Sequence, residues 1–254
     1  MGVRLTNVVG VIPSNRPRFL RHAIARVRSQ GITDIVVVVN GAARDCPLPR
    51  DVVRLESPTR IRGAQAARTT AARWLRELRR HNLVAWFDDD DYYSPQHVEQ
   101  MLEHWEPGAV CCRVSHYVRT KNDSLLRLEF DRETACYPQT MVLAVDDLVV
   151  DWTNRCAEHD ETDWCQRMRA AGKKFVDCGP EHFAFWNGPW RHVWAPLDDE
   201  WPARCDRCYY LGNWDPLVVG GLREPTMQAL VAPTFDDVDR MLRRQLTPEV
   251  NTCP

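Results

Sequence analysis

AWFDDDDYYSP, residues 85–95, ends an apolar run in four consecutive aspartates, Asp88 to Asp91. Like charges repel one another, and stability alone gives no reason to gather them at the end of a buried element. A solvated turn is one explanation, since Asp favours turns and Ser94-Pro95 suits the start of a helix. A bound cation is the other. Because turn chemistry never requires four consecutive aspartates, the sequence favours a cation site.

Upstream of these aspartates, short apolar runs alternate with segments of helical spacing. The run at 34–40 is apolar on both faces, which is typical of a central parallel strand covered by helices. The other predicted elements here are strands at 7–12, 51–56 and 83–87 and helices at 19–27 and 63–80, with Gly31 ending the first helix. This alternation predicts an α/β fold with a mixed sheet and helices on both faces.

Downstream of the aspartates the pattern changes. One strand at 109–118 is predicted to pair with 125–130 through a turn at 121–123, and a further strand is expected at 141–145. Helices are expected at 95–105 and at 160–171, the second ending at Gly172, followed by a strand at 174–178. After residue 179 little periodicity is present until a terminal helix at 235–246.

Composition places the chain among globular enzymes. Its 254 residues are 44% hydrophobic and 27% charged, without a repeat or a long linker, so one continuous domain, 1–254, is expected. A net charge of −2 gives no general attraction to nucleic acid or to anionic membranes. The absence of a signal-peptide pattern or an integral membrane segment predicts a cytoplasmic protein.

Ten cysteines are scattered along the chain, which is typical of buried reduced thiols rather than of a disulfide scaffold. Cys205 and Cys208 form a lone CxxC pair without a second pair at zinc-finger spacing. Zinc or a disulfide at this pair remains an alternative.

The position of the aspartates also indicates function. Ligands of open α/β sheets bind beyond the carboxyl ends of the strands, where Asp88 to Asp91 lie. If the backbone stays extended, Asp88 and Asp90 point to the same side and offer hard oxygen ligands to a divalent cation. Such a cation keeps coordination positions open for phosphate oxygens of a substrate.

Several motifs in order carry a resemblance to a known family: residues 11–17 (VIPSNRP), the strand 35–39, residues 66–68 (AAR) and residues 87–91 (FDDDD). Together they resemble the nucleotide-binding half of family 2-like glycosyltransferases with the GT-A fold. The likeness is good over 7–105, patchier to about 192, and absent beyond. It implies a nucleotide-binding half at 1–105, an acceptor and catalytic half at 106–200 and a C-terminal extension at 201–254.

The resemblance implies a metal-dependent, inverting enzyme that moves a sugar from a nucleoside-diphosphate donor to an acceptor hydroxyl. The D-x-D motif of the family binds Mn²⁺ or Mg²⁺, and it corresponds to Asp88 and Asp90, with Asp91 as a further candidate ligand. Positions that correspond to the donor-binding region are Pro13, Ser14, Asn15, Arg16, Asn40, Arg68, Asp88 and Asp89. Arg68 corresponds to an arginine near the diphosphate; the alternative is an arginine on a helix surface.

The chain departs from the family pattern at one position that recognises the nucleotide base of the donor. The family usually carries an aspartate after its second strand, where this chain has Asn40-Gly41. An amide still offers one donor and one acceptor, so the identity of the base stays open. An Asn-Gly turn without a ligand role is the alternative.

A second acidic group, residues 158–163 (EHDETD), resembles the segment that supplies the catalytic base in this family, with its acidic pair reversed. Direct matching selects Glu161, with Asp160 and Asp163 as alternatives. A base opposite the leaving diphosphate suits a single displacement. Acidic residues also cap helices without any catalytic role. His192 or His182 resembles a histidine that serves some relatives as a metal or diphosphate contact, and His192 is the candidate metal ligand; a lone histidine is more often structural.

Two rival functions stay open. A nucleotidyltransferase shares the layered fold and the metal, but it normally has a Gly-rich first turn with a basic residue, which residues 14–17 lack. A non-catalytic sugar-nucleotide-binding module is the other rival. The acceptor is left undetermined among a small molecule, a glycan, a peptide and a modified nucleic acid.

Overall fold

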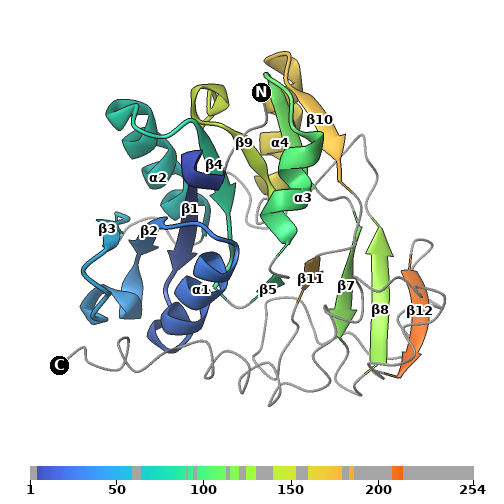
Figure 1. Cartoon of the computed structure of the whole chain (residues 1–254), viewed down its shortest axis with the longest axis horizontal. Helices are drawn as coiled ribbons and strands as arrows, with labels where there is room; N and C mark the ends of the chain where they lie inside the picture. The colour runs from blue at the N-terminus through green and yellow to red at the C-terminus, as the bar shows by residue number, and fades with distance from the viewer. Residues whose placement is uncertain are drawn as a thin grey trace.

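The computed structural model describes residues 5–58, 64–89, 91–93, 96–112, 115–119, 124–129, 140–152, 160–178, 183–185 and 208–213. These residues form two sheets, a seven-stranded one and a five-stranded one beside it (Figure 1). The seven-stranded sheet has the order β10-β6-β9-β4-β1-β2-β3. Its strands are β1 Val8–Ser14, β2 Asp34–Val39, β3 Val52–Glu56, β4 Leu83–Trp86, β6 Ala109–Cys112, β9 Val142–Ala144 and β10 Lys174–Asp177.

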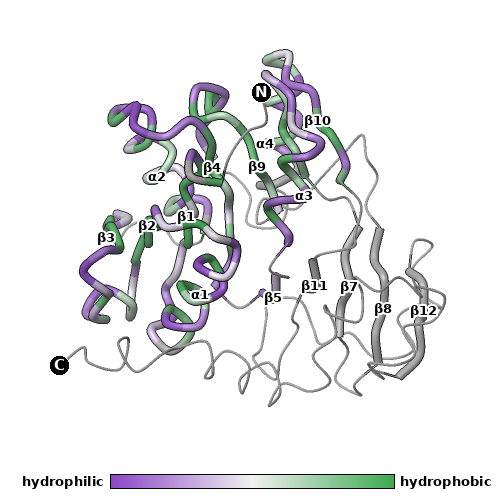
Figure 2. Tube along the Cα trace, in the orientation of Figure 1, coloured by the Kyte–Doolittle hydropathy of each residue, from purple (hydrophilic) through white to green (hydrophobic). Residues whose placement is uncertain are grey.

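Strands β3, β2, β1 and β4 are parallel, and β9 inserts antiparallel between β4 and β6, which makes the sheet mixed. The central strands β1 and β4 are buried along their whole length, as their uninterrupted apolar sequences predict. Figure 2 shows hydrophobic residues along β4 and also along its antiparallel neighbour β9. The predicted strands 7–12, 34–40, 51–56 and 83–87 are thereby confirmed.

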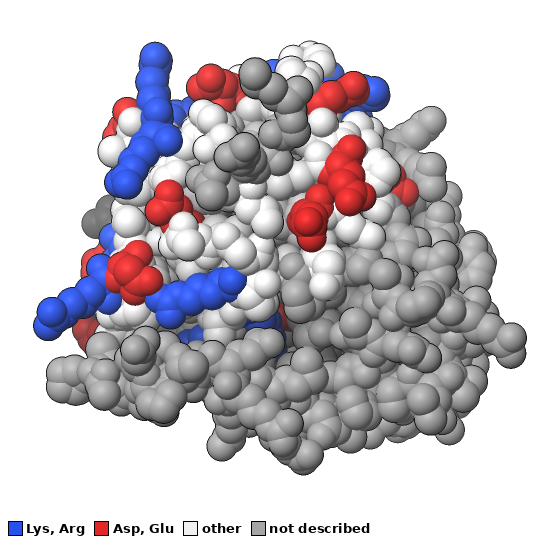
Figure 3. All heavy atoms as spheres, viewed as in Figure 1, with Lys and Arg blue, Asp and Glu red and all other residues white. Residues whose placement is uncertain are grey.

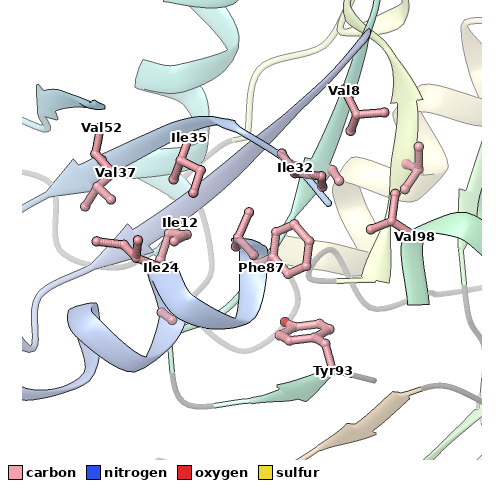
Figure 4. Close-up of a cluster of buried hydrophobic side chains, with 14 of the residues drawn as sticks. Val8, Ile12, Ile24, Ile32, Ile35, Val37, Val52, Phe87, Tyr93 and Val98 are labelled. Carbon is pink, nitrogen blue, oxygen red and sulfur yellow. The ribbon is translucent and has the colours of Figure 1, made fainter. Parts of the chain in front are cut away.

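Helices cover both faces of this sheet, as predicted. Apolar residues of α1 (Pro17–Ser29) and α3 (His97–His104) pack into the core on one face. Those of α2 (Ala64–Leu78) and α4 (Asp160–Ala170) pack into the core on the other. Figure 4 shows the first core, where the ring of Phe87 lies near Tyr93 and between residues of the two helices, Ile24 and Val98.

Close contact between α1 and β1 depends on Gly10 in the middle of β1. A Cβ atom at this position would lie 2.4 Å from Cγ1 of Val27, well inside van der Waals contact. The absence of a side chain therefore lets the helix lie directly on the central strand. Gly31 and Gly172 follow α1 and α4 with φ of +78° and +81°, as predicted for glycines that end helices.

The five-stranded sheet has the order β12-β8-β7-β11-β5. It comprises β5 Tyr92–Tyr93, β7 Ser115–Arg119, β8 Ser124–Glu129, β11 Phe183–Phe185 and β12 Cys208–Asn213. The antiparallel pair β7–β8 confirms the predicted hairpin. The prediction of one strand over 109–118 is wrong, because β6 belongs to the large sheet and β7 to the small one. Only the first half is apolar throughout, as burial within the large sheet requires.

Short 3₁₀ helices complete the described part: η1 Leu5–Asn7, η2 Gly41–Asp45 and η4 Val145–Asp147. Within that part, no helix combines the length and the apolar character that crossing a membrane demands. The helix predicted at 235–246 lies outside the described residues. Cys46, Cys111, Cys112, Cys165 and Cys178 are reduced thiols, four of them buried, as predicted for scattered cysteines.

Candidate functional site

The acidic loop after β4, residues 87–91, lies at the point where the strand order of the large sheet reverses. From β1 the chain proceeds outward through β2 to β3 and then returns to the opposite side of β1 as β4. The loops after β1 and β4 therefore leave neighbouring parallel strands at the same edge of the sheet. Such a switch point is where open α/β sheets bind ligands.

Asp88 is held by two other elements. Strand β4 ends at Trp86, and the N–H of Asp88 donates to the Tyr93 hydroxyl at 2.8 Å. Nη2 of Arg68, on α2, donates to Oδ1 of Asp88 at 2.7 Å. The Arg68 side chain is 2% exposed and that of Asp88 is 24% exposed. This arrangement orients a carboxylate that still reaches solvent.

Asp89 differs from Asp88 although it is next to it. Its side chain is 2% exposed, and its carboxylate binds Ser14, the last residue of β1, and Arg16 in the loop that follows. Asp89 lies in a turn, so the extended backbone that would place alternate aspartates on one side does not continue through it. The two neighbouring carboxylates thus have different partners.

The remaining aspartates complete the loop. Asp91 is buried, and its backbone carbonyl accepts a hydrogen bond from Nη1 of Arg26 on α1. Asp90, the second position of the D-x-D motif, lies outside the described residues. Three arginines, Arg16, Arg26 and Arg68, therefore contact this loop, and their charge offsets the repulsion among its carboxylates.

Asp88 fits the donor set of a hard divalent cation. Only Oδ1 of its carboxylate is bound within the described part of the chain, which leaves Oδ2 for a ligand. Asp89 does not fit, because both of its oxygens already accept hydrogen bonds. No group of three or more metal-ligating side chains occurs among the residues that the structure describes, a set that excludes Asp90 and His192.

The predicted nucleotide-binding positions converge at the same edge. Pro13 and Ser14 end β1, and the N–H of Asn40, directly after β2, donates to the Ser14 carbonyl at 3.0 Å. Asn40 leads into η2 rather than into a simple Asn-Gly turn. A Cβ at Gly41 would lie 3.9 Å from Cβ of Asn15, which places the loops after β1 and β2 side by side.

The described part of the second acidic group, Asp160 to Asp163, lies at the beginning of α4, where Asp160 and Glu161 start the helix, as predicted. Asp163 forms an ion pair of 2.9 Å with Arg167 one turn later and is half-exposed, an arrangement typical of a helix surface. The side-chain surroundings of Asp160 and Glu161 lie outside the described part, as does His192.

A stack of tryptophans connects α4 to the acidic loop. Trp164 of α4 stacks on Trp152 with ring centroids 4.5 Å apart, and Trp152 meets Trp86 edge-on at 5.1 Å. Trp86 is two residues before Asp88, and Trp164 is three residues after Glu161. The beginning of α4 is therefore fixed against the end of β4 through two aromatic contacts.

Two contacts of the site were not predicted from the sequence. Tyr93 carries only a weak signal, its position directly after the aspartates, and Arg26 carries none, because its partner lies 65 residues further along the chain. On the face seen in Figure 3, basic and acidic side chains are interspersed over the coloured residues without a large basic patch.

The mixed sheet and the acidic loop at its switch point define an α/β fold with a candidate ligand site, and comparison with known families makes the class specific. The model of glycosyl transferase family 2 matches residues 9–151, more than half of the chain. The chain belongs to that family. Its mixed sheet with helices on both faces confirms the predicted GT-A type of fold.

Solved structures to which this chain is similar include the inositol-1-phosphate CTP transferase from T. maritima, at 11% identity and a TM-score of 0.47, covering 78% of this chain and 94% of that one. HddC from Yersinia pseudotuberculosis is similar at 11% identity and a TM-score of 0.46, covering 70% of this chain and 92% of that one. No curated protein matches the sequence.

Proposed function

We propose that this chain is a metal-dependent glycosyltransferase that moves a sugar from a nucleoside-diphosphate donor to an acceptor hydroxyl with inversion. The observation that carries the proposal is the geometry of Asp88 at the switch point of the sheet. Its carboxylate is oriented by Arg68 through Oδ1, is partly exposed, and has Oδ2 without a hydrogen bond to any described residue, in a chain that belongs to glycosyl transferase family 2.

The donor would lie across the carboxyl ends of β1, β2 and β4. The loops at 13–16 and at Asn40 would hold its nucleoside, because they leave adjacent parallel strands and lie side by side. Asn40 would contact the base through its amide. Arg68 is buried against Asp88, so its contribution to the diphosphate is exerted through that carboxylate.

Mn²⁺ or Mg²⁺ would be held by Asp88 and Asp90, with Asp91 and His192 as further candidates. When bound, the cation supplies positive charge that stabilises the departing diphosphate. Asp88 is suited to this role because a carboxylate oxygen is a preferred ligand of both ions.

Glu161 would act as the base. It removes the proton of the acceptor hydroxyl while that oxygen bonds to the anomeric carbon; the bond from this carbon to the diphosphate oxygen breaks, and the nucleoside diphosphate leaves with the electron pair. The first turn of α4 favours the ionised carboxylate that a base must have. Asp163 is already paired with Arg167, which favours Glu161 over Asp163 for the role.

The test is a donor screen by thermal shift with and without Mn²⁺, followed by an assay of donor hydrolysis or transfer. Asp88→Ala is expected to abolish the Mn²⁺-dependent shift. Glu161→Gln is expected to retain donor binding and to lower kcat by about 100-fold or more, which is typical for loss of a general base. A matched control is Asp51→Asn, whose exposed carboxylate pairs with Arg28 at 2.5 Å elsewhere on the surface.

The products separate this proposal from its rivals. A glycosyltransferase releases a nucleoside diphosphate from a sugar nucleotide. A nucleotidyltransferase joins a nucleoside triphosphate to a sugar phosphate, and pyrophosphate leaves from the triphosphate. Binding without any turnover, unchanged in Glu161→Gln, is the result expected of a non-catalytic module. No shift with any sugar nucleotide would contradict the proposal.

A further inference from the structure

We infer that Asp89 is a positioning residue, which ties the loop after β1 to the acidic loop and so shapes the donor site without touching the donor. The expected effect of Asp89 on donor binding rests on the proposed function. The contacts that support it belong to the protein alone and require no ligand.

The carboxylate of Asp89 is fully engaged by the loop after β1. The Ser14 hydroxyl donates to Oδ2 at 2.5 Å, and Nε of Arg16 donates to the same oxygen at 3.3 Å. Nη2 of Arg16 donates to Oδ1, which makes the arginine contact bidentate. A carboxylate so deeply buried needs both a countercharge and hydrogen bonds, and these two residues supply them.

The same three residues close a ring of contacts. The backbone N–H of Arg16 donates to Oγ of Ser14 at 3.1 Å, and Oγ in turn donates to Asp89. The Arg16 guanidinium also lies over the Phe19 ring, 4.9 Å from its centroid, at the start of α1. The loop between β1 and α1 is therefore fixed at two points, one on its own helix and one on the acidic loop.

A direct ligand role for Asp89 would require these contacts to break. Asp88, its neighbour, retains an oxygen and some exposure and needs no such change. The two aspartates thus have different roles. Asp88 faces the ligand, and Asp89 sets the spacing between the loop after β1, which would hold the nucleoside, and the acidic loop, which would hold the cation. Fixing both parts before the donor arrives lowers the entropic cost of binding.

The first measurement uses the ligand-free protein. Amide hydrogen exchange of Arg16, whose N–H donates to Ser14, is expected to rise about tenfold in Asp89→Asn, as loss of a charged hydrogen bond implies. Asp51→Asn, which removes an ion pair elsewhere, is expected to leave this exchange unchanged. Unchanged exchange in Asp89→Asn would overturn the inference whatever the protein binds.

The second measurement is a double-mutant cycle on the affinity for UDP and for GDP, each with Mn²⁺. Asp89→Asn is expected to weaken binding of whichever nucleotide binds more tightly by about tenfold. Adding Ser14→Ala is expected to weaken it little further, because both substitutions break the same contact between Ser14 and Asp89. Additive losses would mean that Asp89 and Ser14 act on donor binding independently of their mutual contact and would overturn the inference.

The two proposals fail separately. If neither nucleotide binds to the wild type while exchange still rises in Asp89→Asn, the proposed function loses its support and the tie between the loops stands. If Asp89→Asn does not fold, Arg16→Gln replaces it in the exchange measurement, since it removes the guanidinium that contacts Asp89 and keeps the backbone N–H that donates to Ser14. Normal exchange in that variant would then contradict the inference.

Discussion

Arg68 and Asp88 form an ion pair whose two partners differ in exposure: the arginine side chain is 2% exposed and the aspartate 24%. Nη2 of Arg68 lies 2.7 Å from Oδ1 of Asp88. The arginine belongs to the packed face of α2, whereas the aspartate belongs to a loop at the sheet edge. Removing one partner or the other therefore has different consequences for stability.

Asp88→Ala is expected to lower the free energy of unfolding by about 2 kcal/mol, because it withdraws a countercharge from a buried guanidinium. Arg68→Met is expected to cost less, about 1 kcal/mol, since water can hydrate the aspartate that remains. Urea unfolding monitored by circular dichroism measures both. A larger loss in Arg68→Met than in Asp88→Ala would show that the packing of Arg68, rather than the ion pair, dominates.

Gly10→Ala is expected to destabilise the protein by about 2 kcal/mol, because the added methyl group overlaps Cγ1 of Val27 and forces α1 away from β1. Val27→Ala removes that atom, so in the double variant the losses are expected to be less than additive. Urea unfolding of the two single variants and the double variant gives the coupling.

The matched control for Gly10 is Gly108→Ala. Gly108 has φ of +82° and open space around its missing Cβ, so its substitution strains the backbone without a collision. A loss of about 1 kcal/mol is expected. It should add fully to that of Val27→Ala, and coupling there would argue against a local clash as the cause at Gly10.

Sequence patterns predicted the large sheet well because its strands and helices carry strong periodic signals. β1, β2 and β4 are apolar on both faces, and α1 and α2 each carry an apolar stripe. The small sheet was predicted only in its β7–β8 hairpin. β5 and β11 have two and three residues, too few for any periodicity, and they are brought together by distant pairing.

In the candidate site, too, features set by local sequence were predicted, and contacts with distant residues were not. The position of the acidic loop at a strand end follows from local sequence, and so does the place of Glu161 at the start of a helix. The separate roles of Asp88 and Asp89 do not, because four identical residues in a row carry no signal that distinguishes them. Their partners come from α2 and from the loop after β1, 20 and 75 residues away along the chain.

Native alkylation should distinguish the cysteines by exposure and pKa. Cys46 is partly exposed and, among the five cysteines whose burial the structure describes, is expected to react first with iodoacetamide at pH 8. Cys111 is expected to resist, because its hydrogen bond with the Cys178 thiol and its burial both raise its pKa far above the usual value. Peptide mass spectrometry over time measures the order.

Cys165 supplies the control for this order, since it is buried on the opposite face of the sheet from Cys111 and Cys178. Cys178→Ser keeps a hydrogen-bonding group beside Cys111, whereas Cys178→Ala removes it. Alkylation of Cys111 is expected to become faster only in Cys178→Ala. Equal acceleration in both variants would mean that loss of packing, rather than loss of the hydrogen bond, exposes the thiol.

Stability should fall in mild acid through His81, at the end of the sheet opposite the acidic loop. Its side chain is 8% exposed, and burial lowers its pKa below the ordinary value of 6.5 although Asp34, at 3.5 Å, opposes the shift. Because the unfolded chain then binds a proton more readily than the folded one, stability is lost as the pH falls below about 6.5 and the loss is complete once the folded-state pKa is passed. His81→Gln is expected to flatten this part of the pH profile, measured as urea midpoints between pH 7.5 and 5.

Asp34→Asn removes the charge that favours protonation of His81, so it lowers the pKa of His81 further and should steepen the same loss of stability. A profile that Asp34→Asn flattens instead would show that the ion pair outweighs desolvation at His81.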